Sequence, residues 1–362
     1  MRIAFFGSSL VSAYWNGAAT YYRGLIRALA ERGHEVTFFE PDAYERQQHR
    51  DMEDPPWAKV VVYRNDEAAV FECLDAARKS DVVVKASGVG VFDDVLEKAV
   101  LLLQSSSRLV VFWDVDAPAT LDRVQANPDD PFRNLIPRYN AVLTYGGGDP
   151  VVNAYKELGA RTCVPIYNAL EPTTHCPTRP QPRFEGDLAF LGNRLPDREK
   201  RVEEFFLKPA ALSPGMQFIL GGAGWADKKK PENVRYFDHV FTADHNAFNC
   251  TPRAVINISR ESMARYGYSP ATRVFEAAGA AACIITDEWI GIDHFFEPNH
   301  EILVAATGED VVRHLDNLPA NRARYIGENA YRRALREHTY AHRALRVESI
   351  LEGRQFRAGG AA

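Results

Sequence analysis

Short apolar runs alternate with helical patterns along the first half of the chain, and this alternation restricts the fold more than any other feature. The pattern predicts strands at residues 3–6, 35–39, 59–63, 81–85, 109–113 and 141–145. Between the first two strands, residues 20–32 have the apolar period of an amphipathic helix, and Gly33 is a typical helix-ending residue. Alternating strands and helices of this kind are typical of β–α units on a parallel sheet.

A second α/β run follows a proline-rich stretch. It predicts strands at residues 187–191, 216–220, 234–237, 254–258, 282–286 and 301–304, with helices at 197–206 and 243–249. We therefore expect an N-terminal domain at 1–170, a linker at 171–184, a C-terminal domain at 185–330, a helix crossing back at 331–352 and a disordered tail at 353–362. The predicted fold class is α/β, with two Rossmann-like domains facing a central cleft, where the carboxyl ends of both sheets bind ligands.

Composition excludes several classes of protein. The 362 residues are 46% hydrophobic and 25% charged, as in ordinary soluble globular proteins, and their number suggests two domains. A net charge of −5 argues against nucleic acid or an anionic membrane as the main partner. The five cysteines form no C-x-x-C pair, which disfavours a disulfide framework or a zinc site. No apolar run approaches the roughly 20 residues of a transmembrane helix, and no signal-type segment opens the chain, so we expect a cytoplasmic protein.

Residues 269–287 carry the clearest chemical signal. They predict a loop, a helix beginning at residues 270–272 and a buried strand. Free N–H groups at a helix N-terminus attract anions, and the Arg273 guanidinium beside them suits a phosphate. Glu276, one turn further, could accept hydrogen bonds from two neighbouring hydroxyls. A diphosphate followed by a diol fits a nucleotide sugar. The alternative is an ordinary helix–strand unit in which Arg273 and Glu276 are merely solvated.

With these residues, the C-terminal half resembles nucleotide-sugar glycosyltransferases of the two-Rossmann-domain (GT-B) type, most closely the CgeB-like (spore maturation) family. The matching segments are 190–194, 218–224, 255–258, 269–287, 295–303 and 338–343. The resemblance implies that Glu276 binds the ribose hydroxyls of the donor. It also implies that Ala271, Thr272 and Arg273 approach the donor diphosphate.

The same resemblance suggests further donor contacts. Related retaining enzymes carry a second glutamate eight positions before the first, and here that position is Tyr268, so the stereochemistry of transfer stays open. Relatives place a basic pair after the first strand of the donor domain, for which Arg194 and Arg198 are the candidates, although exposed helix arginines often serve solubility alone. Gly222, in a glycine-rich loop, could approach the donor or simply form a turn.

The N-terminal domain offers two further sets of residues. In GT-B folds the loop before the first helix overhangs the donor, which points to Asn16 and Gly17. No G-x-G-x-x-G follows the first strand, which argues against a dinucleotide site. Asp114 and Asp116 follow the strand at 109–113 and could be a catalytic base, a metal pair or, for Asp116, a helix cap.

The sequence thus predicts a cytoplasmic glycosyltransferase without metal or cofactor, with a UDP- or dTDP-linked sugar as co-substrate. Asp116 is the first candidate for the base, and the acceptor is a small molecule, glycan or protein. The alternatives are a non-catalytic sugar-nucleotide-binding protein, or an epimerase or phosphorylase on the same fold. The oligomeric state stays open.

Overall fold

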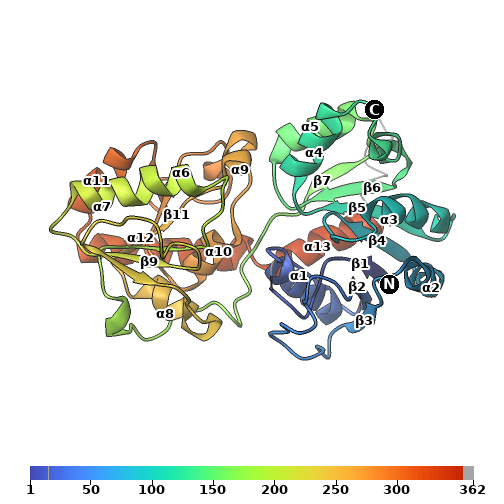
Figure 1. Cartoon of the computed structure of the whole chain (residues 1–362), viewed down its shortest axis with the longest axis horizontal. Coiled ribbons are helices and arrows are strands. Elements are labelled where there is room, and N and C mark those ends of the chain that lie inside the picture. Colours follow the sequence, from blue (N-terminus) through green and yellow to red (C-terminus); the bar gives the residue numbers. More distant parts are fainter. Residues whose placement is uncertain (15, 354–362) are drawn as a thin grey trace. The chain divides into compact units, whose positions relative to one another are not determined.

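The computed structural model describes residues 1–14 and 16–353, and the chain forms two compact units (Figure 1). Unit 1 contains residues 1–167 together with the C-terminal segment from Tyr340, and unit 2 contains Asn168–Thr339. Each unit is built on one parallel sheet with flanking helices, so the predicted class of two Rossmann-like α/β domains is confirmed. The tail predicted at 353–362 lies outside the described residues, apart from Gly353.

Unit 1 contains a seven-stranded parallel sheet in the order β3-β2-β1-β4-β5-β6-β7. Its strands are β1 (Arg2–Phe6), β2 (Glu35–Pro41), β3 (Lys59–Tyr63), β4 (Val82–Ala86), β5 (Leu109–Asp114), β6 (Ala141–Thr144) and β7 (Cys163–Pro165). Six of these match the predicted strands to within two residues at either end. The seventh, β7, lies within the predicted N-terminal domain, at residues for which no strand was predicted.

The helices of unit 1 include one that returns from the far end of the chain. They are α1 (Ala19–Glu31), α2 (Glu67–Ala77), α3 (Asp93–Ala99), α4 (Ala117–Ala126), α5 (Gly148–Glu157) and α13 (Tyr340–Leu351), with short 3-10 turns at Val100–Leu103, Pro131–Asn134 and Ile136–Arg138. Helix α13 lies beside α1 (Figure 1). Gly24 permits this contact, because a Cβ there would lie 2.1 Å from Cδ2 of the Tyr340 ring. Arg32 of the α1 C-terminus forms an ion pair with Glu348.

Unit 2 contains a six-stranded parallel sheet in the order β10-β9-β8-β11-β12-β13. Its strands are β8 (Leu188–Leu191), β9 (Phe218–Gly221), β10 (Val234–Phe237), β11 (Ala254–Asn257), β12 (Ile284–Asp287) and β13 (Leu303–Ala305). The register pairs Ala254 of β11 with Leu188 of β8, and Val255 with Ile284 of β12. The two central strands β8 and β11 therefore mark the point where the strand order reverses.

The helices of unit 2 are short, except for α12. They are α6 (Glu199–Val202), α7 (Lys208–Leu212), α8 (His245–Cys250), α9 (Glu261–Tyr266), α10 (Thr272–Gly279), α11 (Gly308–Asp316) and α12 (Ala320–Glu337), with 3-10 turns at Pro182–Phe184, Thr242–Asp244 and Ile292–His294. The helix predicted at 197–206 is interrupted by a π-helical turn at Glu203–Leu207. Pro209 follows this turn and has no N–H to donate, so the α-helical bonding pattern cannot run through it unbroken.

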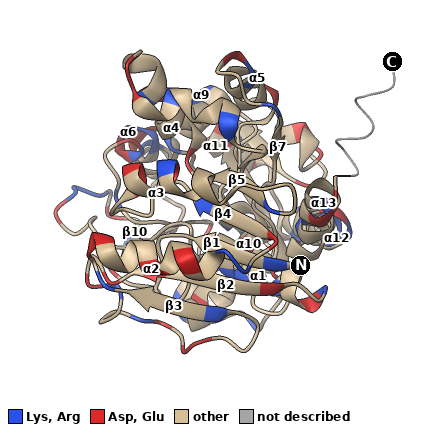
Figure 2. Ribbon diagram, turned by 90° about the vertical axis from the view of Figure 1, so that its right-hand side faces the viewer, with Lys and Arg blue, Asp and Glu red and all other residues tan. Residues whose placement is uncertain are grey.

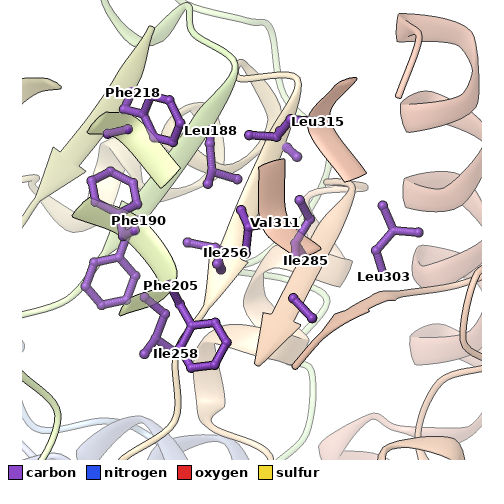
Figure 3. Close-up of a cluster of buried hydrophobic side chains, with 14 of the residues drawn as sticks. Leu188, Phe190, Phe205, Phe218, Ile256, Ile258, Ile285, Leu303, Val311 and Leu315 are labelled. Atoms are coloured by element: carbon purple, nitrogen blue, oxygen red, sulfur yellow. The ribbon is translucent and has the colours of Figure 1, made fainter. Parts of the chain in front are cut away.

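One hydrophobic cluster fills the space between the unit 2 sheet and its helices (Figure 3). Its strand residues include Leu188, Phe190, Phe218, Ile256 and Ile285, all almost fully buried. Continuous apolar strands of this kind are expected where helices cover both faces of a parallel sheet. Phe190 and Ile258 stand where β8 and β11 end, so the core extends to the edge at which ligands bind in such folds.

The segment predicted as a linker is hydrogen-bonded into unit 2. The backbone N–H of Leu170 donates to the carbonyl of His338 at 2.7 Å, and the N–H of Gln181 donates to Thr251 Oγ1 at 2.9 Å. The chain therefore enters unit 2 at Asn168 and leaves it at Thr339. These two points are close together, because Leu170 and Thr339 form a β-bridge.

Basic and acidic residues are interspersed over the elements seen in Figure 2, in keeping with a formal net charge of −5. The prediction that nucleic acid is not the main partner rests on this balance and stays a prediction. None of the described helices is long and apolar enough to cross a membrane.

Candidate functional site

Two guanidinium groups converge where β8 and β11 end. The Cζ atoms of Arg198 and Arg273 each lie 5.6 Å from the centroid of the Phe190 ring. A Cβ on Gly192 would lie 3.0 Å from Nη2 of Arg198 and 3.3 Å from Nη2 of Arg273, so both groups border this glycine. The sequence prediction that Arg198 and Arg273 serve one site is therefore consistent with their placement, and Phe190 is the shared support that it missed.

These guanidinium groups interact with neutral oxygens. Arg198 donates to the backbone carbonyl of Asn193, while Arg273 donates to Asn257 Oδ1 at 3.4 Å and to the Ile258 carbonyl at 3.3 Å. Among the described residues, neither arginine forms an ion pair with a carboxylate. Two positive charges thus stand together with no carboxylate of the described residues at ion-pair distance, although Asp197, Glu276 and Asp287 are near enough to act on them, and this is an arrangement suited to binding an anion.

Burial makes this arrangement costly. Burial, and next the neighbouring Arg273 cation, lowers the pKa of Arg198 to about 9. Burial likewise lowers the pKa of Arg273. The Nε atom of Arg198 is buried without a hydrogen-bond partner. A bound diphosphate would offset these costs, because its oxygens accept charge-assisted hydrogen bonds from guanidinium groups.

The N-terminus of α10 adds backbone donors beside this pair. Ala271 occupies the N-cap position and offers no capping side chain, and Thr272 and Arg273 open the helix. The first N–H groups of a helix have no partner within it and favour anions. Ala271, Thr272 and Arg273 are therefore placed as the prediction of a diphosphate contact requires, although that contact stays a prediction.

Glu276 lies on α10, one turn beyond Thr272. Its side chain is 19% exposed, and Nε2 of His175 lies 3.8 Å from its Oε1. No hydrogen bond to its carboxylate is formed within the described part of the chain, so both oxygens can accept from a ligand. The prediction that Glu276 binds ribose hydroxyls is compatible with this geometry and stays untested.

Arg194, the second member of the predicted basic pair, is already neutralised. Its Nε and Nη2 atoms donate to Glu199 at 2.9 and 2.7 Å, and its Nη1 atom donates to Asp227 at 3.0 Å. These hydrogen bonds, first with Glu199 and then with Asp227, raise the pKa of Arg194. The geometry therefore favours a role for Arg194 in joining two loops over donor binding.

Gly222 allows the loops after β8 and β9 to approach each other. It has φ +123°, and a Cβ there would lie 2.6 Å from the carbonyl carbon and oxygen of Gly192. Trp225 Nε1 donates to the same Gly192 oxygen at 2.8 Å. Turn formation and close packing account for this glycine, so the turn alternative is the one that the structure favours.

Tyr268 has a left-handed backbone conformation, with φ 44°. Its N–H donates to the Ile290 carbonyl at 2.7 Å, and its ring packs against Gly291, where a Cβ would lie 2.3 Å from Cδ1 of the ring. Strained conformations of bulky residues occur frequently at functional sites. Tyr268 thus stands at the sequence position where related enzymes have the second glutamate. Its aromatic ring is held against Gly291, in the loop that follows β12.

In unit 1, the side chain of Asn16 is engaged within its own loop. Its Nδ2 donates to the carbonyls of Ser9 and Ser12 at 2.8 and 3.0 Å, and its Oδ1 accepts from Ser8 Oγ at 2.9 Å. Gly17 borders open space, with no atom within 4 Å of an added Cβ. The donor contacts predicted for Asn16 and Gly17 therefore rest on the family resemblance alone.

Asp114 and Asp116 do not face one side together. Asp114 is fully buried and accepts hydrogen bonds from Ser87 Oγ at 2.8 Å, Thr120 Oγ1 at 3.0 Å and the Tyr155 hydroxyl. Burial raises its pKa. This closed network favours a structural role for Asp114 over a catalytic one.

Asp116 is partly exposed at the N-cap position of α4 but makes no capping hydrogen bond, so its predicted capping role is wrong. The prediction that it is a catalytic base stays open. In the described parts of both units, no three His, Cys, Asp or Glu side chains are grouped as a metal site.

Solved structures with the same fold cover nearly the whole chain. The chain is similar to sucrose-phosphate synthase from Thermosynechococcus elongatus, with TM-score 0.68, 14% identity and coverage of 99% of this chain and 100% of that one. It is also similar to HepE from Anabaena in complex with UDP and glucose, with TM-score 0.66, 13% identity and coverage of 98% and 100%. An alpha-glucosyltransferase in complex with UDP-glucose and DNA gives TM-score 0.69, 13% identity and coverage of 97% and 99%. The fold is therefore that of the GT-B glycosyltransferases.

One family model matches part of the second half of the sequence. Residues 198–349, less than half of the chain, match a family model described as glycosyl transferase-like. This match begins at Arg198 and includes Arg273 and Glu276. No curated protein matches the chain in sequence.

Proposed function

We propose that this protein transfers a sugar from a nucleoside-diphosphate sugar, UDP- or dTDP-linked, to an acceptor hydroxyl. The observation that carries the proposal is the pair of guanidinium groups, Arg198 and Arg273, which lie on Phe190 with no ion pair to a carboxylate of the described residues. A diphosphate supplies the negative charge that this pair lacks. The structural relatives whose names include UDP or UDP-glucose support a uridine nucleotide.

In the proposed reaction the acceptor oxygen forms a bond to the anomeric carbon while the bond from that carbon to the diphosphate oxygen breaks. The acceptor loses its proton to a base, and the nucleoside diphosphate leaves with the bonding electron pair. Arg198, Arg273 and the α10 N-terminus stabilise the charge that develops on the leaving oxygen. Glu276 fixes the donor through its ribose hydroxyls.

Several finer assignments belong to the same proposal. We place the chain in the CgeB-like group on the sequence resemblance, and we expect a cytoplasmic enzyme whose arginines replace a metal ion. The acceptor is a small molecule, a glycan or a protein. No other cofactor is needed, since the donor carries its own leaving group, the nucleoside diphosphate, which departs with the bonding electron pair.

A ligand-binding screen tests the donor site. We expect UDP or dTDP to raise the melting temperature by several degrees, with and without EDTA, and GDP and ADP to have smaller effects. Arg273→Gln should weaken UDP binding about 10- to 100-fold, the usual effect of losing a charge-assisted hydrogen bond. Arg324→Gln, at an exposed position of α12, is the matched control. Wild-type affinity in Arg273→Gln would contradict the diphosphate assignment.

Asp116 is the proposed base, and its substitution separates catalysis from binding. Asp116→Asn keeps the size of the side chain but cannot take a proton at neutral pH, so transfer and donor hydrolysis should fall about 100-fold or more while UDP affinity is unchanged. Both quantities can be measured by UDP release and calorimetry. Full activity in this variant would assign the base elsewhere. Donor binding by the wild type without release of UDP from any UDP-sugar would favour a non-catalytic binding protein.

A further inference from the structure

The carboxylate of Glu276 has one ionisable side chain of the described structure within ion-pair distance, the imidazole of His175. Their Nε2 and Oε1 atoms lie 3.8 Å apart. The His175 side chain is 9% exposed and the Glu276 side chain 19%, so both are largely shielded from water. His175 belongs to the segment between Asn168 and β8, which the sequence predicted to be a linker and which carried no functional expectation.

The imidazole of His175 is held on its other side. Its Nδ1 atom lies 3.0 Å from Thr174 Oγ1. The Thr174 hydroxyl has a second acceptor, the Glu171 carbonyl oxygen at 3.2 Å. When the hydroxyl donates to Nδ1, or when the ring is protonated, Nε2 carries the hydrogen that faces Glu276. The Thr174 carbonyl in turn accepts from Asn246 Nδ2 of α8 at 2.9 Å, and the His175 N–H donates to the Glu171 carbonyl at 3.0 Å.

The backbone of this segment lies directly on α10. A Cβ on Gly279 would lie 2.7 Å from the His175 carbonyl oxygen and 2.4 Å from Leu170 Cδ1, so only glycine permits this approach. At the other end of α10, Asn168 Nδ2 donates to the Pro270 carbonyl at 3.2 Å, and Thr272 Oγ1 donates to Asn168 Oδ1 at 3.3 Å. The segment from Asn168 to His175, which we call the α10 strap, therefore contacts the helix at both ends.

We propose that His175 is a positioning residue that directs the Glu276 carboxylate toward the ribose hydroxyls of the donor. The inference rests on the proposed function, because it assigns His175 an effect only through Glu276 and the ribose. Arg273 is the other charged group near Glu276, but it lies on the same helix and faces the Phe190 ring. The imidazole, at ion-pair distance and not at hydrogen-bond distance, is thus the side chain that restricts the carboxylate before the donor arrives, which lowers the entropy lost on binding.

The experiment compares two ligands, UDP and 2′,3′-dideoxy-UDP, by calorimetry on the full chain. The wild type should prefer UDP about 10-fold or more, because only UDP offers the two hydroxyls. His175→Ala should lower UDP affinity about three- to tenfold and leave dideoxy-UDP affinity unchanged. Glu276→Gln is the reference, since it should lose most of the preference directly.

Two further variants keep the test decisive if His175→Ala folds poorly. His175→Gln keeps an N–H donor on a side chain of similar reach and should restore part of the preference for UDP. Thr174→Val removes the hydroxyl that holds Nδ1 and should change the preference in the same direction as His175→Ala, by a smaller factor. Thermal melting of each variant controls for global destabilisation.

The possible failures are distinguishable. If the His175 variants lose affinity for both nucleotides equally, or for neither, while Glu276→Gln loses the preference, the positioning role is overturned and the donor site stands. If the wild type binds UDP and dideoxy-UDP equally and Glu276→Gln has no effect, the ribose assignment fails and the role of His175 fails with it.

Discussion

At the scale of single residues, the candidate site contains two buried guanidinium groups, those of Arg198 and Arg273, whose burial lowers the stability of the folded state. Arg198 is 5% exposed, and its folded-state pKa of about 9 lies well below the ordinary value for arginine. The folded state therefore binds this proton less readily than the unfolded state, so the charge lowers stability at neutral pH. This cost begins to fall as pH rises above about 9 and is lost only above the pKa of arginine in the unfolded chain. Such a cost is expected where a residue is retained for ligand binding.

Replacing Arg198 should consequently improve stability and weaken binding. Arg198→Met keeps an unbranched side chain over the Phe190 ring and removes the buried charge. We expect a gain in unfolding free energy of about 1–2 kcal/mol together with a loss of UDP affinity of at least about 10-fold. Denaturant unfolding and calorimetry measure the two quantities. A variant that is less stable and still binds UDP would show that Arg198 is a structural residue.

The same residue predicts the pH dependence of donor binding. Arg198 must be protonated to bind a diphosphate, and its pKa is about 9, so UDP affinity should fall as pH rises through that value. Above it, the fall should approach about tenfold per pH unit. Calorimetric titrations at several values between pH 7.5 and 10.5 test this. Arg198→Met serves as the control, because ionisation of the nucleotide itself persists in that variant. Identical profiles for both proteins would exclude Arg198 as the titrating group.

At the scale of secondary structure elements, features encoded in consecutive residues could be predicted from the sequence, whereas contacts between distant segments could not. The sequence predicted the helix start at 270–272 together with Arg273 and Glu276, because the residues that form an anion-binding helix N-terminus are adjacent in the sequence. Arg194 and Arg198 looked equivalent in sequence. They differ because Glu199 and Asp227 together neutralise Arg194, and Asp227 lies 33 residues away. His175 was hidden in a proline-rich stretch, and its proximity to Glu276 depends on how that stretch packs against α10.

Helix α10 depends on a residue without a side chain. In an isolated helix, Gly279→Ala would gain up to about 1 kcal/mol of helix propensity, but here the Cβ would overlap the strap at Leu170 and His175. We expect a net destabilisation of about 1 kcal/mol and weaker UDP binding, because the strap must move away from Glu276. Gly215→Ala is the matched control, since nothing lies within 4 Å of its Cβ. A more stable Gly279→Ala variant with unchanged UDP affinity would contradict the contact between strap and helix.

At the scale of the whole molecule, unit 1 is assembled from both ends of the chain. Helix α13 contributes buried Tyr340, Ala344, Val347, Ile350 and Leu351, and it covers α1. Each large apolar side chain that is buried contributes about 1.5–3 kcal/mol, so the sum is comparable with the stability of a typical domain.

Removing residues 340–362 should therefore unfold unit 1 selectively. Unit 2 keeps its entire sheet and the site residues within Asn168–Thr339. Limited proteolysis of the shortened chain should degrade fragments from residues 1–167 first and leave a resistant fragment of unit 2. Deleting only 354–362, which the structure does not describe, is the control and should leave the digestion pattern unchanged. Equal resistance of both units would show that α13 adds little to unit 1.

The return of the chain to its first unit also orders events during synthesis. A ribosome makes α1 within the first 31 residues and α13 only after every strand of unit 2 has emerged. While the residues between α1 and α13 are being synthesised, the apolar surface of α1 that contacts Tyr340 is exposed to solvent or bound by a chaperone. Unit 2 can close on itself as soon as Thr339 has left the exit tunnel, while unit 1 cannot. The half of the protein that is made first is thus the half that finishes last.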